Sequence, residues 1–202
     1  TIKMKKLLLM AAVLLASVGA YAQHAVGSFT LQPRVGLNVA NFTDIDDSDP
    51  RVGFAGGVEG EYQVSDIFSV SAGAIYSMQG SKYSESGSDF TAKCDYINVP
   101  IMANVYVVKG LAVKLGIQPG FNVNSEDNFE YSGTSLAFNG SKSSKSDIKT
   151  VDFSIPVGLS YEFPTVPIVI DARYNWGLTK VADGGDSKNS VFQFTLGYKF
   201  DL

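Results

Sequence analysis

The sequence has 202 residues with 16 basic and 20 acidic side chains, and 45% of its residues are hydrophobic. This acidic balance argues against binding to nucleic acid, which depends on a basic surface, and the length suits a single domain. One cysteine, Cys94, excludes an intramolecular disulfide framework, and we expect it to be a surface thiol.

The first 22 residues have the pattern of a cleaved secretion signal. Lys5 and Lys6 precede an apolar core at residues 7–18, and Ala22 closes a small-x-small cleavage site. We therefore expect a signal peptide at 1–22 and a single β-barrel domain at 23–202. The alternative, an N-terminal membrane anchor, is disfavoured because a spanning helix needs about 20 apolar residues. No run of that kind follows, so the mature chain could enter a membrane only as a closed barrel.

Eight segments alternate apolar and polar residues with a period of two, which predicts β-strands. Most are about twice the length of an ordinary strand and long enough to cross lipid at a tilt, which takes about 9–11 residues. The clearest signal is a hairpin at 96–124 that turns at Lys109-Gly110. The predicted strands are residues 28–40, 52–63, 68–79, 96–107, 111–124, 151–163, 168–178 and 190–202.

The connectors between these strands alternate in length. The long, polar ones are residues 41–51, 80–95, 125–150 and 180–189, and the short ones are 64–67, 108–110 and 164–167. This pattern predicts an all-β, eight-stranded antiparallel up-and-down transmembrane β-barrel with four extracellular loops and both termini in the periplasm. A secreted soluble β-sandwich is the alternative, but it would not sort its connectors by length.

The face opposite the apolar rows carries Gly, small polar residues and charges. Eight strands leave a bore that side chains can fill, and buried charges require partners. We therefore predict a polar network that plugs the lumen, and gated or slow ion passage is the alternative. The pattern leaves the pairing open. The predicted network consists of Arg34, Glu59, Glu61, Lys114, Asp152, Glu162, Asp171, Arg173 and Lys199.

Candidate catalytic and metal-binding residues are few. His24 is the sole histidine and precedes the first strand, so the loops offer no imidazole for general-base chemistry. The carboxylate pair Asp46 and Asp47 lies in an acidic loop, residues 44–49, that we expect to be solvated. Calcium binding there is an alternative, but the loop lacks the central Gly and distal Glu of an EF-hand. We expect no enzyme activity, cofactor or metal.

Aromatic residues near the strand ends predict a girdle at the membrane interfaces. The last predicted strand, 190–202, alternates aromatic residues up to its end, which resembles the signal that outer-membrane barrels present to their insertion machinery. The predicted girdle consists of Tyr62, Tyr76, Tyr106, Tyr161, Trp176 and Tyr198.

Four segments, 53–80, 96–123, 152–181 and 194–200, carry a resemblance to the PorT-like outer-membrane β-barrel family. The Tyr-Ile-x-x-Pro entry at 96–100, the Lys-Gly turn and Ala-Arg-Tyr-x-x-Gly-Leu at 172–178 are its most specific motifs. The resemblance implies a porin-like barrel of about eight strands in a Gram-negative envelope, without a defined substrate. We expect a structural or surface-interaction role, with lipid and an unidentified extracellular ligand or envelope protein as partners. A narrow pore or an accessory of a secretion system is the alternative.

Overall fold

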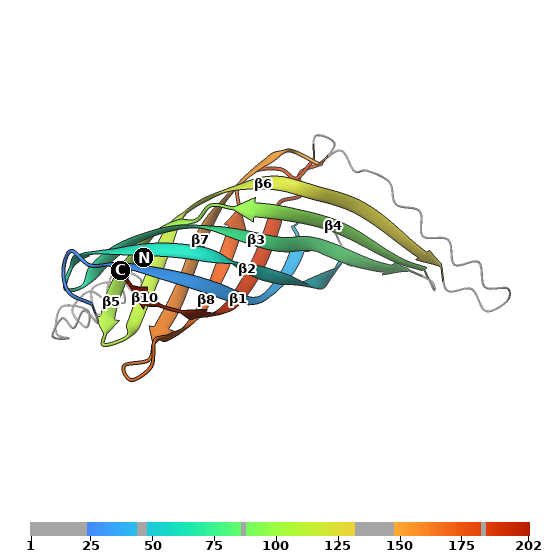
Figure 1. Ribbon diagram of the computed structural model, residues 1–202. Helices are drawn as coiled ribbons and strands as arrows, with labels where there is room; N and C mark the ends of the chain where they lie inside the picture. The colour runs from blue at the N-terminus through green and yellow to red at the C-terminus, as the bar shows by residue number, and fades with distance from the viewer. Residues whose placement is uncertain (1–23, 44–47, 86–87, 132–147, 183–184) are drawn as a thin grey trace, which may run out of the picture.

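The computed structural model describes residues 24–43, 48–85, 88–131, 148–182 and 185–202, which form one antiparallel sheet (Figure 1). The expected signal peptide and cleavage site at 1–22 lie outside the described residues. The strands are β1 (Phe29–Phe42), β2 (Ser48–Ser65), β3 (Phe68–Glu85), β4 (Ser88–Asn98), β5 (Ile101–Val108), β6 (Leu111–Tyr131), β7 (Val151–Glu162), β8 (Ile168–Gly177), β9 (Asn189–Tyr198) and β10 (Phe200–Asp201).

These ten strands occupy eight positions around a closed ring, as the alternation predicted. β4 and β5 share one position between β3 and β6, and they are separated at Val99-Pro100 because proline supplies no N–H to the ladder. β1 closes the ring by pairing with β9 from Arg34 to Phe42 and with β10 at Thr30 and Leu31. The Leu202 amide donates to the Phe29 carbonyl at 3.0 Å, so the chain end meets the start of β1. We call this the terminal end of the barrel.

β3, β4 and β6 project well beyond the ring at the opposite end, which we call the loop end (Figure 1). β3 and β4 form one hairpin, whose pairing runs from Ile75 and Asn98 to Glu85 and Ser88. The other edge of β4 pairs with β6. The prediction of loops across 80–95 and 125–131 was therefore wrong. β2 also begins at Ser48, inside the predicted loop 41–51.

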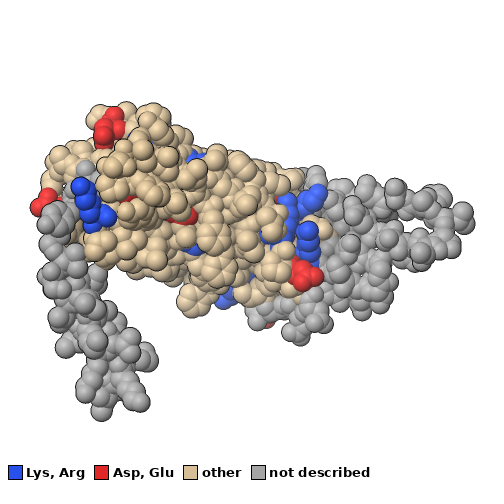
Figure 2. Space-filling model, turned by 90° about the horizontal axis from the view of Figure 1, so that it is seen from below, with Lys and Arg blue, Asp and Glu red and all other residues tan. Residues whose placement is uncertain are grey.

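The apolar rows face outward and the polar rows face the lumen. Phe121, Phe153 and Phe194 are about half exposed, whereas Lys114 and Glu162 are buried. On the face in Figure 2, charged side chains gather near the two ends and the wall between them is almost uncharged. A water-soluble protein has the reverse arrangement, because continuous apolar surface of this extent costs free energy in water.

No helix among the described residues is long and apolar enough to cross a membrane.

Candidate functional site: the charged lumen

The nine charged side chains named from the sequence are all buried inside the ring. Eight of them lie on the inner faces of strands whose outer faces are apolar, because successive residues of a strand point to opposite sides of the sheet. Lys199 lies between β9 and β10. Eight of the nine fall into two groups of contacts, one halfway along the barrel and one at the terminal end. Asp152 stands apart and accepts a hydrogen bond from the Thr179 hydroxyl at 2.5 Å.

The central cluster consists of Arg34, Glu59, Lys114, Asp171 and Arg173, all 2% exposed or less. Oδ2 of Asp171 lies 2.8 Å from Nη2 of Arg173, 3.1 Å from Nζ of Lys114 and 3.5 Å from Nη1 of Arg34. Glu59 receives the same three cations, with nitrogen–oxygen distances of 2.9–3.3 Å. The carboxylates of Glu59 on β2 and Asp171 on β8 therefore form ion pairs with cations from β1, β6 and β8.

The terminal cluster consists of His24, Glu61, Glu162, Lys199 and Asp201. Nζ of Lys199 donates to Glu61 at 3.0 Å and to Glu162 at 2.8 Å. The His24 ring lies 2.7 Å from Glu162 and 2.8 Å from Asp201, on opposite ring nitrogens. The hydrogen bond to Glu162 raises the pKa of His24, which precedes the first strand, above its ordinary value of 6.5. The segment before β1 is thereby attached to β7 and to the chain end.

Tyr106 belongs to this end of the lumen and not to the interfacial girdle. It is 7% exposed and its hydroxyl donates to Glu61, which also accepts from the Ser69 hydroxyl at 2.5 Å. The girdle prediction was therefore wrong for Tyr106, because even-numbered residues of β5 point inward. Five of the six predicted girdle residues are exposed on the outer wall: Tyr62, Tyr76, Tyr161, Trp176 and Tyr198.

A third charged pair, Arg51 and Asp95, lies near the loop end at 3.6 Å and was missed by sequence reasoning. Arg51 also donates to the Gln79 carbonyl, and the Tyr76 hydroxyl donates to Asp95 at 2.9 Å. Both charged residues fell inside segments predicted as loops. The only sequence signal was that Arg51 continues the odd-numbered inner face of β2.

Cys94 is buried inside β4, so its prediction as a surface thiol was wrong. Its neighbours along the chain, Asp95 and Tyr96, are both buried, and a register shift in the pairing with β6 lies between them. A bulge of this kind breaks the period-two rule, because two consecutive residues point to the same side.

Several buried polar atoms in the lumen have no hydrogen-bond partner among the described residues. They include Nε and Nη1 of Arg34, Nη1 of Arg173 and Nε2 of Gln193. Because such atoms carry a free-energy cost when unsatisfied, they mark positions where the lumen can hold water or a small solute.

The described residues contain no group of three or more His, Cys, Asp or Glu side chains placed to hold a metal ion. Most of the acidic loop weighed for calcium, residues 44–47, lies outside the described residues. Among the residues described, the one imidazole contacts two carboxylates and has no serine or cysteine nucleophile bonded to it. In this geometry the His24 ring takes part in ion pairing at the terminal end.

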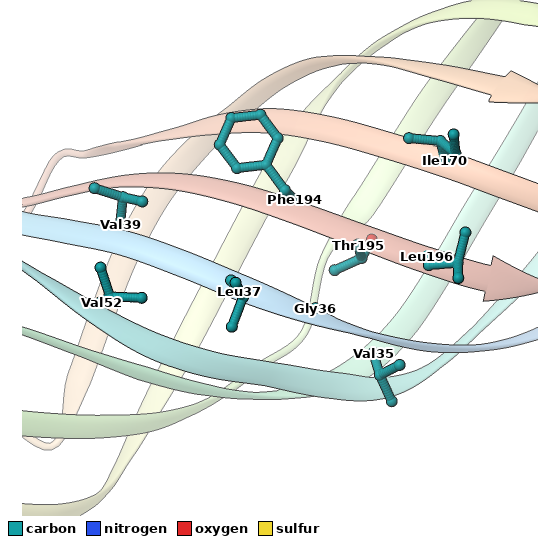
Figure 3. A pocket seen from close by; sticks show the side chains of 9 residues that line it. All are labelled: Val35, Gly36, Leu37, Val39, Val52, Ile170, Phe194, Thr195 and Leu196. Carbon is teal, nitrogen blue, oxygen red and sulfur yellow. The ribbon is translucent and has the colours of Figure 1, made fainter.

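A groove of about 600 Å³ lies on the outer wall, where β1, β2, β8 and β9 meet. Figure 3 shows its lining, including Leu37, Ile170 and Phe194, as almost entirely aliphatic and aromatic. Because this lining is almost entirely apolar, the groove suits an acyl chain and not a polar substrate.

Comparison with known proteins identifies the family to which this architecture belongs. A family model for the outer membrane protein beta-barrel domain matches residues 21–183. The chain belongs to this family. It is a protein of the cell outer membrane, and the wall described above is its lipid-facing surface.

Several solved structures are similar to this chain, and the similarity to the first of them shows a shared fold. Ail, the attachment invasion locus protein of Yersinia pestis, solved with the heparin analogue sucrose octasulfate, is 16% identical and aligns over 87% of this chain and 100% of its own, with a TM-score of 0.51. OprG from Pseudomonas aeruginosa is 13% identical over 89% of this chain and 99% of its own, with a TM-score of 0.46. Neisserial surface protein A is 14% identical over 86% and 97%, with a TM-score of 0.47. No curated protein sequence matches the chain.

Proposed function

We propose that this outer-membrane barrel is a non-enzymatic envelope protein whose lumen is closed by its own side chains. The observation that supports this is the central cluster, in which five charged side chains from four strands are buried and share two carboxylates. Moving an ion past them would require breaking contacts in a region of low dielectric constant. The barrel then acts as a scaffold that holds its loops at the cell surface.

The surface role belongs to the loop end. We assign the four connectors at the loop end to the cell exterior and both termini to the periplasm, so the projecting parts of β3, β4 and β6 extend the scaffold outward. The exposed residues Phe200 and Leu202 at the end of the chain fit a signal for the insertion machinery. Closer kinship to the PorT-like family rests on the motifs in segments 53–80, 96–123 and 152–181.

Conductance of the refolded full barrel in planar lipid bilayers tests the closed lumen. We expect no steady single-channel openings, because an ion crossing the lumen would have to separate the buried ion pairs of the central cluster. Stable, ion-selective openings of uniform size would contradict the proposal. They would favour the alternative of a narrow pore, which draws support from the unpartnered polar atoms along the lumen.

The surface role is tested separately on intact cells. A photo-crosslinker placed in the connector at 132–150 should capture a defined envelope or extracellular partner, whereas one placed in the short turn at 108–110 should not. Equal labelling from both positions would contradict the assignment of the loop end to the exterior.

A further inference from the structure

The groove of about 600 Å³ on the outer wall follows the seam where β1 pairs with β9 (Figure 3). Its sides are outward-facing residues, Val35 and Leu37 on β1 and Phe194 and Leu196 on β9, each 52–57% exposed. The residues between them on each strand, such as Gly36, lie on the inner face, so the floor of the groove is backbone. The seam is therefore a recess in the wall with apolar sides.

The groove begins near the interfacial girdle of the loop end. Val39, which lines it, shares a row of the sheet with Tyr174, and the next outward row pairs Ser190 with Trp176, one of the girdle residues. Leu196 lies six residues further along β9 than Ser190, about 20 Å along the strand. Strands of such barrels tilt by about 40°, so this is about 15 Å along the membrane normal, half of a hydrocarbon core of about 30 Å. The groove therefore extends from the interface towards the middle of the bilayer, as an acyl chain does.

Two hydroxyl groups lie on the same wall at the level of the girdle. The hydroxyl oxygens of Tyr174 and Ser190 are 2.9 Å apart, and either can be the donor. Both residues continue the even-numbered, outward-facing rows of β8 and β9. Two hydroxyls have two donors and their mutual bond uses one, so one O–H is left without an acceptor among the residues that the structure describes.

We propose that the groove binds one ester-linked acyl chain of a bilayer lipid, whose ester carbonyl accepts a hydrogen bond from the Tyr174–Ser190 hydroxyl pair. The chain gives the apolar sides of the recess the contacts that an empty groove lacks. Ester carbonyls lie where headgroups meet hydrocarbon, which is the level of the girdle. Because the groove is part of the lipid-facing wall, bilayer lipid already surrounds it and is its occupant.

A comparison of two synthetic lipids tests this site on the refolded mature barrel. One is a diester phosphatidylcholine, and the other is the diether lipid of the same headgroup and chain length, which has no ester carbonyl. Native mass spectrometry from detergent should show one retained diester lipid per barrel. Retention of the diether lipid should be about fivefold weaker, as expected for the loss of one neutral hydrogen bond.

Three results of this comparison would overturn the proposal. Equal retention of the two lipids would remove the hydrogen bond to the carbonyl. Barrels that retain neither lipid would show that the groove has no fixed occupant. A lipid-free dimer that Leu37→Trp disrupts would show that the groove is a contact between two copies of the chain.

Filling the groove provides a second test. Leu37→Trp places a large side chain in the recess and should abolish the retained lipid. Leu115→Trp is the matched control, because Leu115 is also 55% exposed on the outer wall but lies on β6, outside the groove. Wild-type retention by a folded Leu37→Trp barrel, or equal loss in both variants, would contradict the site.

Removing the hydroxyl pair separates its role from that of the groove. Tyr174→Phe combined with Ser190→Ala keeps the apolar lining, so this variant should retain diester and diether lipids equally. The control Tyr161→Phe removes an outward-facing hydroxyl elsewhere on the wall and should keep the preference for the diester. A wild-type preference in the double variant would show that the pair does not bind the carbonyl.

Discussion

Glu59 and Asp171 are the residues on which the lumen depends, because each accepts contacts from three cations. Replacing either of these buried carboxylates leaves the three cations of the central cluster with a single negative partner. The lengths and spacing of the strands in the sequence do not show which cations contact Glu59 and Asp171. Such pairing across the lumen depends on the stagger between strands that are far apart in the sequence.

At Glu59 the expected effect is large. Glu59→Gln keeps the shape of the side chain but leaves Arg34, Lys114 and Arg173 with one carboxylate, and breaking a buried ion pair in this way costs about 3–5 kcal/mol. Urea unfolding of the barrel in lipid vesicles measures the change. Lys180→Gln, which removes an exposed pair with Asp186, is the control and should leave the unfolding midpoint unchanged. Equal midpoints for Glu59→Gln and wild type would refute the role of the cluster.

His24 gives the terminal end a dependence on pH. Its pKa is raised in the folded barrel, chiefly by the hydrogen bond to Glu162, so the protonated ring favours folding. This contribution is complete below the ordinary imidazole pKa of 6.5 and is lost as the pH rises through the higher folded pKa. The groups that face the ring are Glu162, Asp201 and Lys199.

The comparison of wild type with His24→Gln checks this. The difference in unfolding midpoint between the two should be largest near pH 6 and should shrink towards pH 9. A difference that grows with pH would show that the ring is bound in its neutral form.

At the scale of single strands, the sequence was most informative where strands cross the membrane. The predicted bounds of β7 and β8 agree with the structure to within one residue, because lipid outside and polar groups inside enforce strict alternation. β3, β4 and β6 continue past the ring at the loop end, where we expect both faces to be free to carry polar residues. The alternation fades there, and the extensions were taken for loops.

The seam between β1 and β9 requires glycine at position 36. A Cβ atom on Gly36 would lie 1.9 Å from the Phe194 carbonyl oxygen and 2.6 Å from Cα of Thr195, so the backbones approach too closely for a side chain. The sequence shows this glycine on the inner face but does not show that its neighbour is backbone.

Gly36→Ala should therefore strain the closure of the ring. We expect a destabilisation of about 1–3 kcal/mol, as for overpacked sites, measured by urea unfolding in vesicles. Gly185→Ala is the matched control, because its added Cβ would meet only one atom, at 4.0 Å. If the two variants unfold at the same denaturant concentration, the close approach of β1 and β9 does not hold in solution.

For the whole molecule, composition and alternation were sufficient to predict an eight-position barrel, with apolar residues outside and charges inside. They could not predict which charges meet. Asp95 was missed because residues 80–95 were predicted to be a loop, and Arg51 because β2 was predicted to start after it. His24 was missed because it precedes the first strand. The side-chain contacts that define both clusters can therefore be read only from the folded ring, in which strands distant in the sequence come together.

The outward orientation of the apolar rows is tested most directly by Trp176, the single tryptophan of the sequence, which is 57% exposed on the outer wall. Its fluorescence should be recorded for the barrel refolded in bilayers whose acyl chains carry bromine at different depths. We predict blue-shifted emission that is quenched by the brominated lipids, most strongly by those with bromine nearer the headgroup, and little quenching by aqueous iodide. Emission that brominated lipids leave unchanged and iodide quenches would show that this wall faces water.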